Sequence, residues 1–172
     1  MKKQNGFTLI ELVVVIIILG ILAVTAAPKF LNFQSDALKS TVSGLEGALK
    51  SADSLVYSKS VIAGNDGTAK SSTNGPEVTL PGNKKVALNY GHPTPVWSGS
   101  LENALDINAA ASGTTTDWLF KVVASENAIY FYPQGQKDPK ASSDAGKCFV
   151  KYTNGLSAKG SASVTKDVSA CL

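Results

Sequence analysis

A long apolar segment near the N-terminus constrains this chain more than any other feature. Residues 12–27 carry no charge, and 11 large aliphatic side chains lie between Leu12 and Val24. As a helix rising about 1.5 Å per residue, residues 7–27 would span roughly the 30 Å hydrocarbon core of a bilayer. At about 1.5–3 kcal/mol each, burial of those side chains contributes roughly 15–30 kcal/mol. The segment therefore belongs in lipid or inside a bundle of similar helices.

Glu11 is a carboxylate placed inside this segment, and it separates the possible interpretations. A secretory signal peptide would use Lys2 and Lys3 as its basic region and be cut after Thr25-Ala26-Ala27. That interpretation explains neither Glu11 nor the proline that follows the cut at Pro28. A plain membrane anchor explains the length and the lysines, but it leaves in lipid a carboxylate that costs about 2.5–3.5 kcal/mol.

A cut between Gly6 and Phe7 would create a partner for Glu11. The freed α-amine of Phe7 has an ordinary pKa of about 7.7–8.0 and is largely cationic at neutral pH. Positions i and i+4 share one face of a helix, so the pair is possible within one chain as well as between neighbouring chains. On this interpretation, Glu11 fixes the register in which chains assemble.

The run Gly6-Phe7-Thr8-Leu9-Ile10-Glu11-Leu12, after a short lysine-containing leader, resembles the type III signal of type IV prepilins. The resemblance implies that a membrane-embedded prepilin peptidase removes the leader, residues 1–6, and that the Phe7 amine is methylated. It implies that Glu11 pairs with the Phe7 amine of a neighbouring subunit. It also implies that inner-membrane machinery assembles subunits from the lipid into a homopolymeric filament.

The helix is expected to continue beyond the hydrophobic part, residues 7–28. Apolar positions recur at spacings of seven, four and three, which places them on one helical stripe. They are Leu31, Leu38, Val42, Leu45, Leu49, Ala52 and Val56. The pattern predicts an amphipathic helix over residues 29–60, packed on the chain's own sheet or, alternatively, in a coiled coil. Gly20 and Pro28 weaken the helix, and the resemblance implies that the stretch between them loses order in filaments.

The rest of the chain predicts a polar head. Residues 61–77 are turn-rich and predict an exposed loop, followed by a sheet within residues 78–172. Strands are expected at 78–80, 84–90, 118–124, 129–132 and 148–153, a turn at residues 125–127, and a short helix over 100–108 with Ser100 as its N-cap. The expected fold class is α+β, a long N-terminal helix packed on a C-terminal antiparallel sheet, which is the pilin fold.

Two cysteines occur late in the chain, Cys148 and Cys171. Their spacing matches no metal site, whereas an even count in an exported chain favours a disulfide over two free thiols. The same bond is implied by the resemblance, in which it bounds the C-terminal region, here residues 148–171.

Other chemistry has little support in the sequence. All 16 basic residues are lysines and the formal net charge is +3, so the arginine contacts typical of nucleic-acid recognition are missing and no specific nucleic acid is expected. His92, the single histidine, is expected in a loop without a catalytic role, because no nucleophile or orienting carboxylate can be assigned to it. We expect no catalytic residue, no metal site and no cofactor.

The resemblance implies a type IVa major pilin, held in the inner membrane as a precursor and then part of an extracellular pilus used for surface attachment. Residues 90–95 and the late cysteine pair are similar to mannose-sensitive haemagglutinin-type pilins, which implies biofilm formation and makes a surface glycan a candidate ligand. A type II secretion pseudopilin shares the N-terminal motif and usually has a calcium site in place of the disulfide. A secreted binding protein or enzyme would instead begin near Pro28.

Overall fold

The computed structural model describes residues 6–71, 75–154 and 160–172, so residues 1–5 of the expected leader and 72–74 of the expected loop lie outside the described residues. Its dominant element is α1, a 55-residue helix from Leu9 to Ala63, which at 1.5 Å per residue is about 80 Å long. The helix starts two residues later than predicted because Thr8 is an extended N-cap. Its C-cap is Gly64, whose left-handed backbone, with φ of 72°, closes the last turn.

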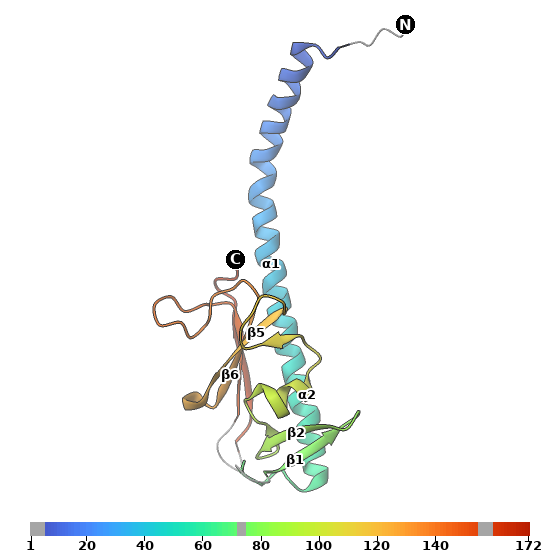
Figure 1. Cartoon of the computed structure of the whole chain (residues 1–172), viewed down its shortest axis with the longest axis vertical. Helices are drawn as coiled ribbons and strands as arrows, with labels where there is room; N and C mark the ends of the chain where they lie inside the picture. The colour runs from blue at the N-terminus through green and yellow to red at the C-terminus, as the bar shows by residue number, and fades with distance from the viewer. Residues whose placement is uncertain (1–5, 72–74, 155–159) are drawn as a thin grey trace.

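The first half of α1 extends away from the rest of the molecule (Figure 1). Its large apolar side chains are exposed, and the segment Leu9–Ala26 is long and apolar enough, by length and composition, to cross a membrane. The helix continues without a break through Gly20 and Pro28 and curves gently (Figure 1). The flexion expected between these two positions in a filament stays a prediction.

The second half of α1 packs against two sheets. The three-stranded sheet has the order β1-β2-β3 and is antiparallel, with strands Glu77–Leu80, Lys84–Asn89 and His92–Pro93. The five-stranded sheet has the order β4-β5-β6-β7-β8, with strands Ala109–Ala110, Trp118–Val123, Ala128–Pro133, Phe149–Thr153 and Ser163–Asp167. Its described strand pairs are antiparallel except β4 and β5, which run parallel. The α+β class is confirmed, with two sheets where one was expected.

Local structure differs from the predictions between residues 97 and 108 and at β8. The helix predicted over residues 100–108 is a single turn, α2, at Glu102–Ala104, preceded by the kinked turn η1 at Trp97–Leu101. The N-cap role of Ser100 is wrong, because its buried hydroxyl donates to the Thr94 carbonyl at 3.0 Å. Strand β8 was not predicted, because no residue in it is fully buried and apolar alternation is therefore weak.

The turn predicted at residues 125–127 is confirmed. The 3-10 turn η2, Ala124–Glu126, is followed by Asn127 in the left-handed region with φ of 46°, and together they join β5 to β6. Asparagine tolerates this conformation better than most residues. The turn places Glu126 beside the face of the sheet that carries Tyr130 and Lys151.

The core consists of two apolar clusters along α1. The smaller cluster joins Val56 to Val78 and Leu80 of β1 and to Val86 and Leu88 of β2. The larger cluster packs α1 against the five-stranded sheet. Its buried members are Val42, Leu45, Leu49, Ala52, Leu101, Leu105, Trp118, Ile129, Phe131, Cys148, Val150, Tyr152 and Cys171. From Leu38 to Val56 the apolar stripe of α1 therefore packs on the chain's own sheets, which is the first of the two predicted alternatives.

Candidate assembly site and the anchors of the head

The residues predicted to direct assembly lie at the first turn of α1. The backbone N–H and the hydroxyl of Thr8 donate to Oε2 of Glu11 at 2.8 and 2.7 Å. In return, Thr8 Oγ1 accepts from the Glu11 N–H at 3.3 Å. This reciprocal arrangement is a capping box, which satisfies N–H groups that a helix start leaves open. The carboxylate thus has a partner within its own chain.

The capping box changes the geometry expected for Phe7. Phe7 precedes the N-cap and is 85% exposed, so it is not part of the helix, although it lines the same open surface hollow as Glu11. Both bonds from Thr8 reach Oε2, which leaves Oε1 without a hydrogen-bond partner among the described residues. A cut between Gly6 and Phe7 would leave the box intact, since the Thr8 N–H belongs to the following peptide bond.

The role of Thr8 was missed by the sequence analysis. A Thr followed three residues later by Glu, directly before an apolar run, is the sequence signature of a capping box and was present in the chain. Glu11 is thus a capping residue as well as a charge in the apolar segment. One side chain serves both purposes, because a capping carboxylate uses only part of its acceptor capacity.

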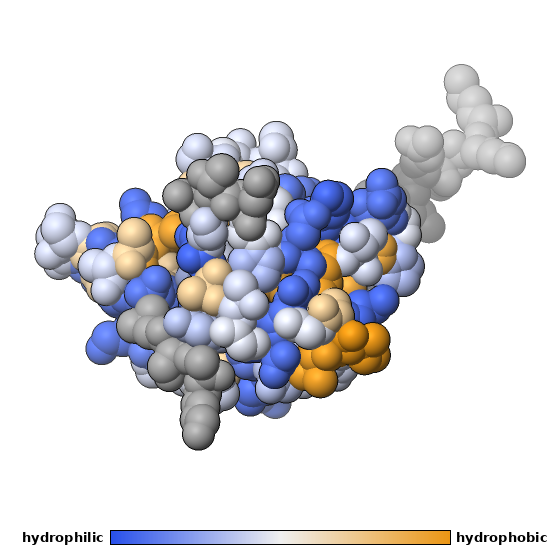
Figure 2. All heavy atoms as spheres, turned by 90° about the horizontal axis from the view of Figure 1, so that it is seen from below, coloured by the Kyte–Doolittle hydropathy of each residue, from blue (hydrophilic) through white to orange (hydrophobic). Residues whose placement is uncertain are grey.

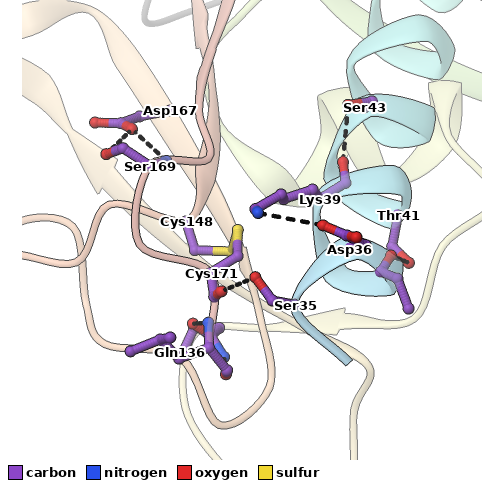
Figure 3. Close-up of a disulfide and its surroundings, with 12 residues drawn as sticks. Ser35, Asp36, Lys39, Thr41, Ser43, Gln136, Cys148, Asp167, Ser169 and Cys171 are labelled. Carbon is purple, nitrogen blue, oxygen red and sulfur yellow. Dashed lines mark hydrogen bonds and ion pairs between the residues drawn. A yellow bond between two sulfur atoms is a disulfide. The ribbon is translucent and has the colours of Figure 1, made fainter. Parts of the chain in front are cut away.

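The C-terminus is attached to the rest of the head by a disulfide and by hydrogen bonds (Figure 3). Cys148 and Cys171 are bonded, with their Cα atoms 4.8 Å apart and both side chains buried. The carbonyl of Cys171 accepts from Ser35 Oγ of α1 at 2.7 Å. The side-chain amide of Gln136 pairs with the backbone of Leu172, donating at 2.5 Å and accepting at 3.4 Å. The end of the chain is therefore tied to α1 and to the loop after β6.

An ion pair and a hydrogen bond connect the edge strand β8 to α1. Lys166 Nζ lies 2.9 Å from Glu46 Oε2 and 2.9 Å from Ser43 Oγ. Lys50 reaches the other oxygen of Glu46 at 2.6 Å. The hydrogen bonds from Lys50 and Lys166 lower the pKa of Glu46 below its ordinary value. These contacts explain how a strand without a fully buried residue is positioned.

A second carboxylate, Glu126, holds the loop after β6. It accepts from the Tyr130 hydroxyl at 2.5 Å, from Lys151 at 2.7 Å and from Lys140. The bonds from Lys140, Lys151 and Tyr130 lower the pKa of Glu126 to about 2. Both ammonium groups also face the Tyr130 ring, at 4.9 and 5.3 Å from its centroid. Several C-terminal lysines are thus paired internally, which agrees with a solvated face better than with a basic binding patch.

His92 is not in a loop, so that expectation is wrong. It lies in β3, is 8% exposed, and places Nδ1 2.9 Å from Oδ1 of Asp53. The Tyr57 ring stacks on the imidazole with centroids 4.6 Å apart. The orienting carboxylate that the sequence could not assign is therefore Asp53, from α1. Among the described residues, no Ser, Thr or Cys side chain forms a hydrogen bond with the imidazole.

Asp53 also accepts from the hydroxyl of Tyr152 in β7 at 2.9 Å. Burial raises the pKa of Tyr152 well above its ordinary value, and the charge of Asp53 adds to that effect. The hydroxyl therefore remains a donor at physiological pH. Tyr152 faces the core together with Val150, because residues two apart lie on the same face of a strand.

Comparisons with known proteins find matches at the N-terminus, which includes the first turn of α1. Residues 1–27 match the family model described as the prokaryotic N-terminal methylation motif. PilA5, a type IV narrow pilus major component of Thermus thermophilus, is 42% identical over 50 residues, which is 29% of this chain and 43% of the relative. A type IV major alpha-pilin of Moraxella bovis is 48% identical over 52 residues, 30% of this chain and 33% of the relative.

A further relative is the type IV major pilin protein PilA of Myxococcus xanthus, which is 40% identical over 57 residues, 33% of this chain and 26% of the relative. The chain spans less than half the length of these curated relatives. The comparison with solved structures found no match. The N-terminus is thus similar to that of proteins with this methylation motif. Over about a third of its length the chain is similar to type IV pilins, and it carries their prepilin signal.

Proposed function

We propose that this chain is a structural subunit of a type IV pilus, cleaved between Gly6 and Phe7 and methylated on the Phe7 amine. The observation that carries the proposal is an exposed apolar half-helix that contains a single carboxylate, Glu11, at its start. An exposed aliphatic surface of this size is stable only in lipid or against other apolar helices. A subunit that moves from a membrane pool into a helical bundle uses both environments in turn.

Glu11 supplies the register of assembly. Oε2 keeps the capping box with Thr8, and Oε1 is open to a second donor. In an apolar surrounding, an ammonium group that reaches Oε1 forms a charge-assisted hydrogen bond and relieves the cost of the lone carboxylate. The Phe7 amine of a neighbouring subunit, exposed after cleavage and still cationic when methylated, fits that role. Each new subunit is then stabilised only in the axial position that brings the two groups together.

The head fits exposure to water outside the cell. Its end opposite the apolar half-helix is largely hydrophilic, with the most prominent hydrophobic patch near its edge and smaller apolar areas elsewhere (Figure 2). The buried disulfide suits an oxidising compartment. We assign the filament to surface attachment and biofilm formation, with the precursor in the inner membrane, a prepilin peptidase and an assembly machinery as partners, and a surface glycan as the candidate ligand.

The proposal is tested by mass spectrometry of the mature N-terminus together with two substitutions of Glu11. We expect N-methyl-Phe7 as the first residue. Glu11→Gln keeps an acceptor for the Thr8 capping box but removes the charge, whereas Glu11→Ala removes both. Both variants are expected to insert into the membrane and to be impaired in filament formation. Wild-type filament yield from Glu11→Gln would mean that capping, and not charge pairing, is the role of this residue.

The second candidate is a type II secretion pseudopilin, because the matched family model describes an N-terminal methylation motif and names no machine. The carboxylates of the loop after β6 are engaged by lysines, Asp138 with Lys121 at 3.6 Å and Asp144 with Lys137. Calcium-dependent stability of the head would favour the pseudopilin, and long surface filaments would favour the pilin. A mature N-terminus near Pro28 would exclude both and favour a secreted protein with an ordinary signal peptide.

A further inference from the structure

The head contains a buried polar junction that assembly through α1 does not use. Its centre is the carboxylate of Asp53, which contacts His92 Nδ1 at 2.9 Å and the Tyr152 hydroxyl at 2.9 Å. Asn154 completes it, because its side-chain N–H groups donate to the Pro93 carbonyl at 2.7 Å and lie 3.3 Å from that of His92. The polar junction thus connects α1, the three-stranded sheet and the five-stranded sheet through four side chains.

The polar junction lies where the two apolar clusters meet. Along α1, Ala52 belongs to the larger cluster and Val56 to the smaller one, with Asp53 between them. Among the described residues, the larger cluster has 13 buried members and includes the disulfide, whereas the smaller has five. The three-stranded sheet is therefore attached to α1 through fewer buried apolar side chains than the five-stranded sheet is.

The polar junction reaches the three-stranded sheet through its shortest strand. β3 consists of His92 and Pro93 alone and pairs with β2 at Leu88 and Asn89. A strand of two residues forms few ladder bonds, so the side-chain contacts of His92 are a large part of its attachment to α1. Loss of one partner would leave a partly buried carboxylate, 16% exposed, poorly satisfied, which costs more than the net gain of an ordinary hydrogen bond.

We propose that the Asp53 junction is a latch on the three-stranded unit, residues 77–93. While Asp53 holds His92 and Tyr152, the unit stays docked on α1. When that hold is lost, the unit opens as a separate cooperative segment and the five-stranded sheet stays folded around its disulfide. Opening would expose Val56 and the apolar face of β1 and β2, next to Leu55 and Ile62, which are already 51% and 86% exposed. The head can then change shape at one end without global unfolding.

The test is hydrogen exchange of the full-length chain in detergent micelles, followed by mass spectrometry of its peptides. The variant is Asp53→Asn, which keeps an oxygen acceptor for Tyr152 but removes the charge. The matched control is Asp36→Asn, an exposed acid on the same helix that contacts Lys39 at 3.3 Å. In Asp53→Asn we expect peptides from residues 77–93 to exchange at least about tenfold faster, while those from 118–133 and 149–153 change less than about twofold. The control is expected to match the wild type.

Two results would overturn the latch: equal acceleration in all three regions, which would mean a single cooperative head, and no acceleration in residues 77–93. If Asp53→Asn does not fold, exchange of the wild type at increasing urea concentrations decides the question. Amides of β1 and β2 should then exchange through an opening with a weaker urea dependence than amides of β5 to β7. The same urea dependence in both groups would refute the proposal.

Discussion

The Glu11 carboxylate and the Thr8 hydroxyl lie 2.7 Å apart at the first turn of α1. The contact means that the charge of Glu11 is already partly satisfied within its own chain. In the proposed filament, Thr8 and the Phe7 amine of a neighbouring subunit would bind the same carboxylate. Assembly as proposed would add a cation to an existing capping box and would leave the start of the helix unchanged.

Thr8→Val is expected to lower filament yield with little effect on leader cleavage. Valine is similar in shape, but it loses the hydroxyl, and loss of a threonine cap costs about 0.5–2 kcal/mol. Thr8→Ser is the matched control, because it keeps the hydroxyl and should behave like the wild type. Filament yield and precursor processing are both measured by immunoblot of sheared and whole-cell fractions. Equal yields from Thr8→Val and Thr8→Ser would show that the box plays no part in assembly.

Removal of the disulfide is expected to destabilise the head by about 3 kcal/mol, the value that loop-closure entropy assigns to a closed loop of this size. The measurement is urea unfolding of wild type and of the double variant Cys148→Ala/Cys171→Ala, each with and without reductant. Reductant should lower the stability of the wild type alone. Two alkylatable thiols in the purified mature protein would contradict the bond itself.

Glu126 should make the head sensitive to acid. Its pKa in the folded chain, about 2, lies below the ordinary value of 4.5, so its stabilisation is present above pH 4.5 and is lost as the pH falls toward 2. The side chain is 31% exposed, and water limits such pairs to about 1 kcal/mol or less each. The unfolding temperatures of wild type and Glu126→Gln should therefore differ most above pH 5 and converge near pH 2.

The control is Glu77→Gln, which breaks an exposed pair with Lys85 and should have a smaller effect on the unfolding temperature. A difference between wild type and Glu126→Gln that is the same at pH 3 and pH 7 would contradict the assignment.

Gly91→Ala is expected to destabilise the head more than Gly82→Ala. Both glycines have left-handed φ values, 84° and 80°, so both variants carry a similar backbone cost of about 1 kcal/mol. A Cβ on Gly91 would also approach Tyr57 Cδ2, Ser60 Oγ and Asp66 Cα to 3.0 Å, whereas nothing lies within 4 Å at Gly82. Crowding should add at least about 1 kcal/mol at Gly91. Urea unfolding measures the difference, and equal values would mean that the turn after β2 is not packed against α1.

Elements with a local periodic signal were predictable from the sequence. The apolar stripe of α1, the strands β1, β2, β5, β6 and β7, and the turn before Asn127 all follow from residue types a few positions apart. Strand β8 and the short strands β3 and β4 carry no such signal, because they are positioned by contacts and not by their own hydrophobic pattern. Lys166 on Glu46 is one example, and His92 on Asp53 is another.

The sequence by itself determined that this chain has an apolar half-helix, a single carboxylate at its start and two late cysteines, since each of these depends only on residue identity and spacing. Tertiary structure alone decided what the carboxylates contact. Asp53 meets a histidine 39 residues away and a tyrosine 99 residues away, and Ser35 meets the Cys171 carbonyl 136 residues away. Polar contacts over such separations depend on how the chain closes around its core, and no local pattern encodes them.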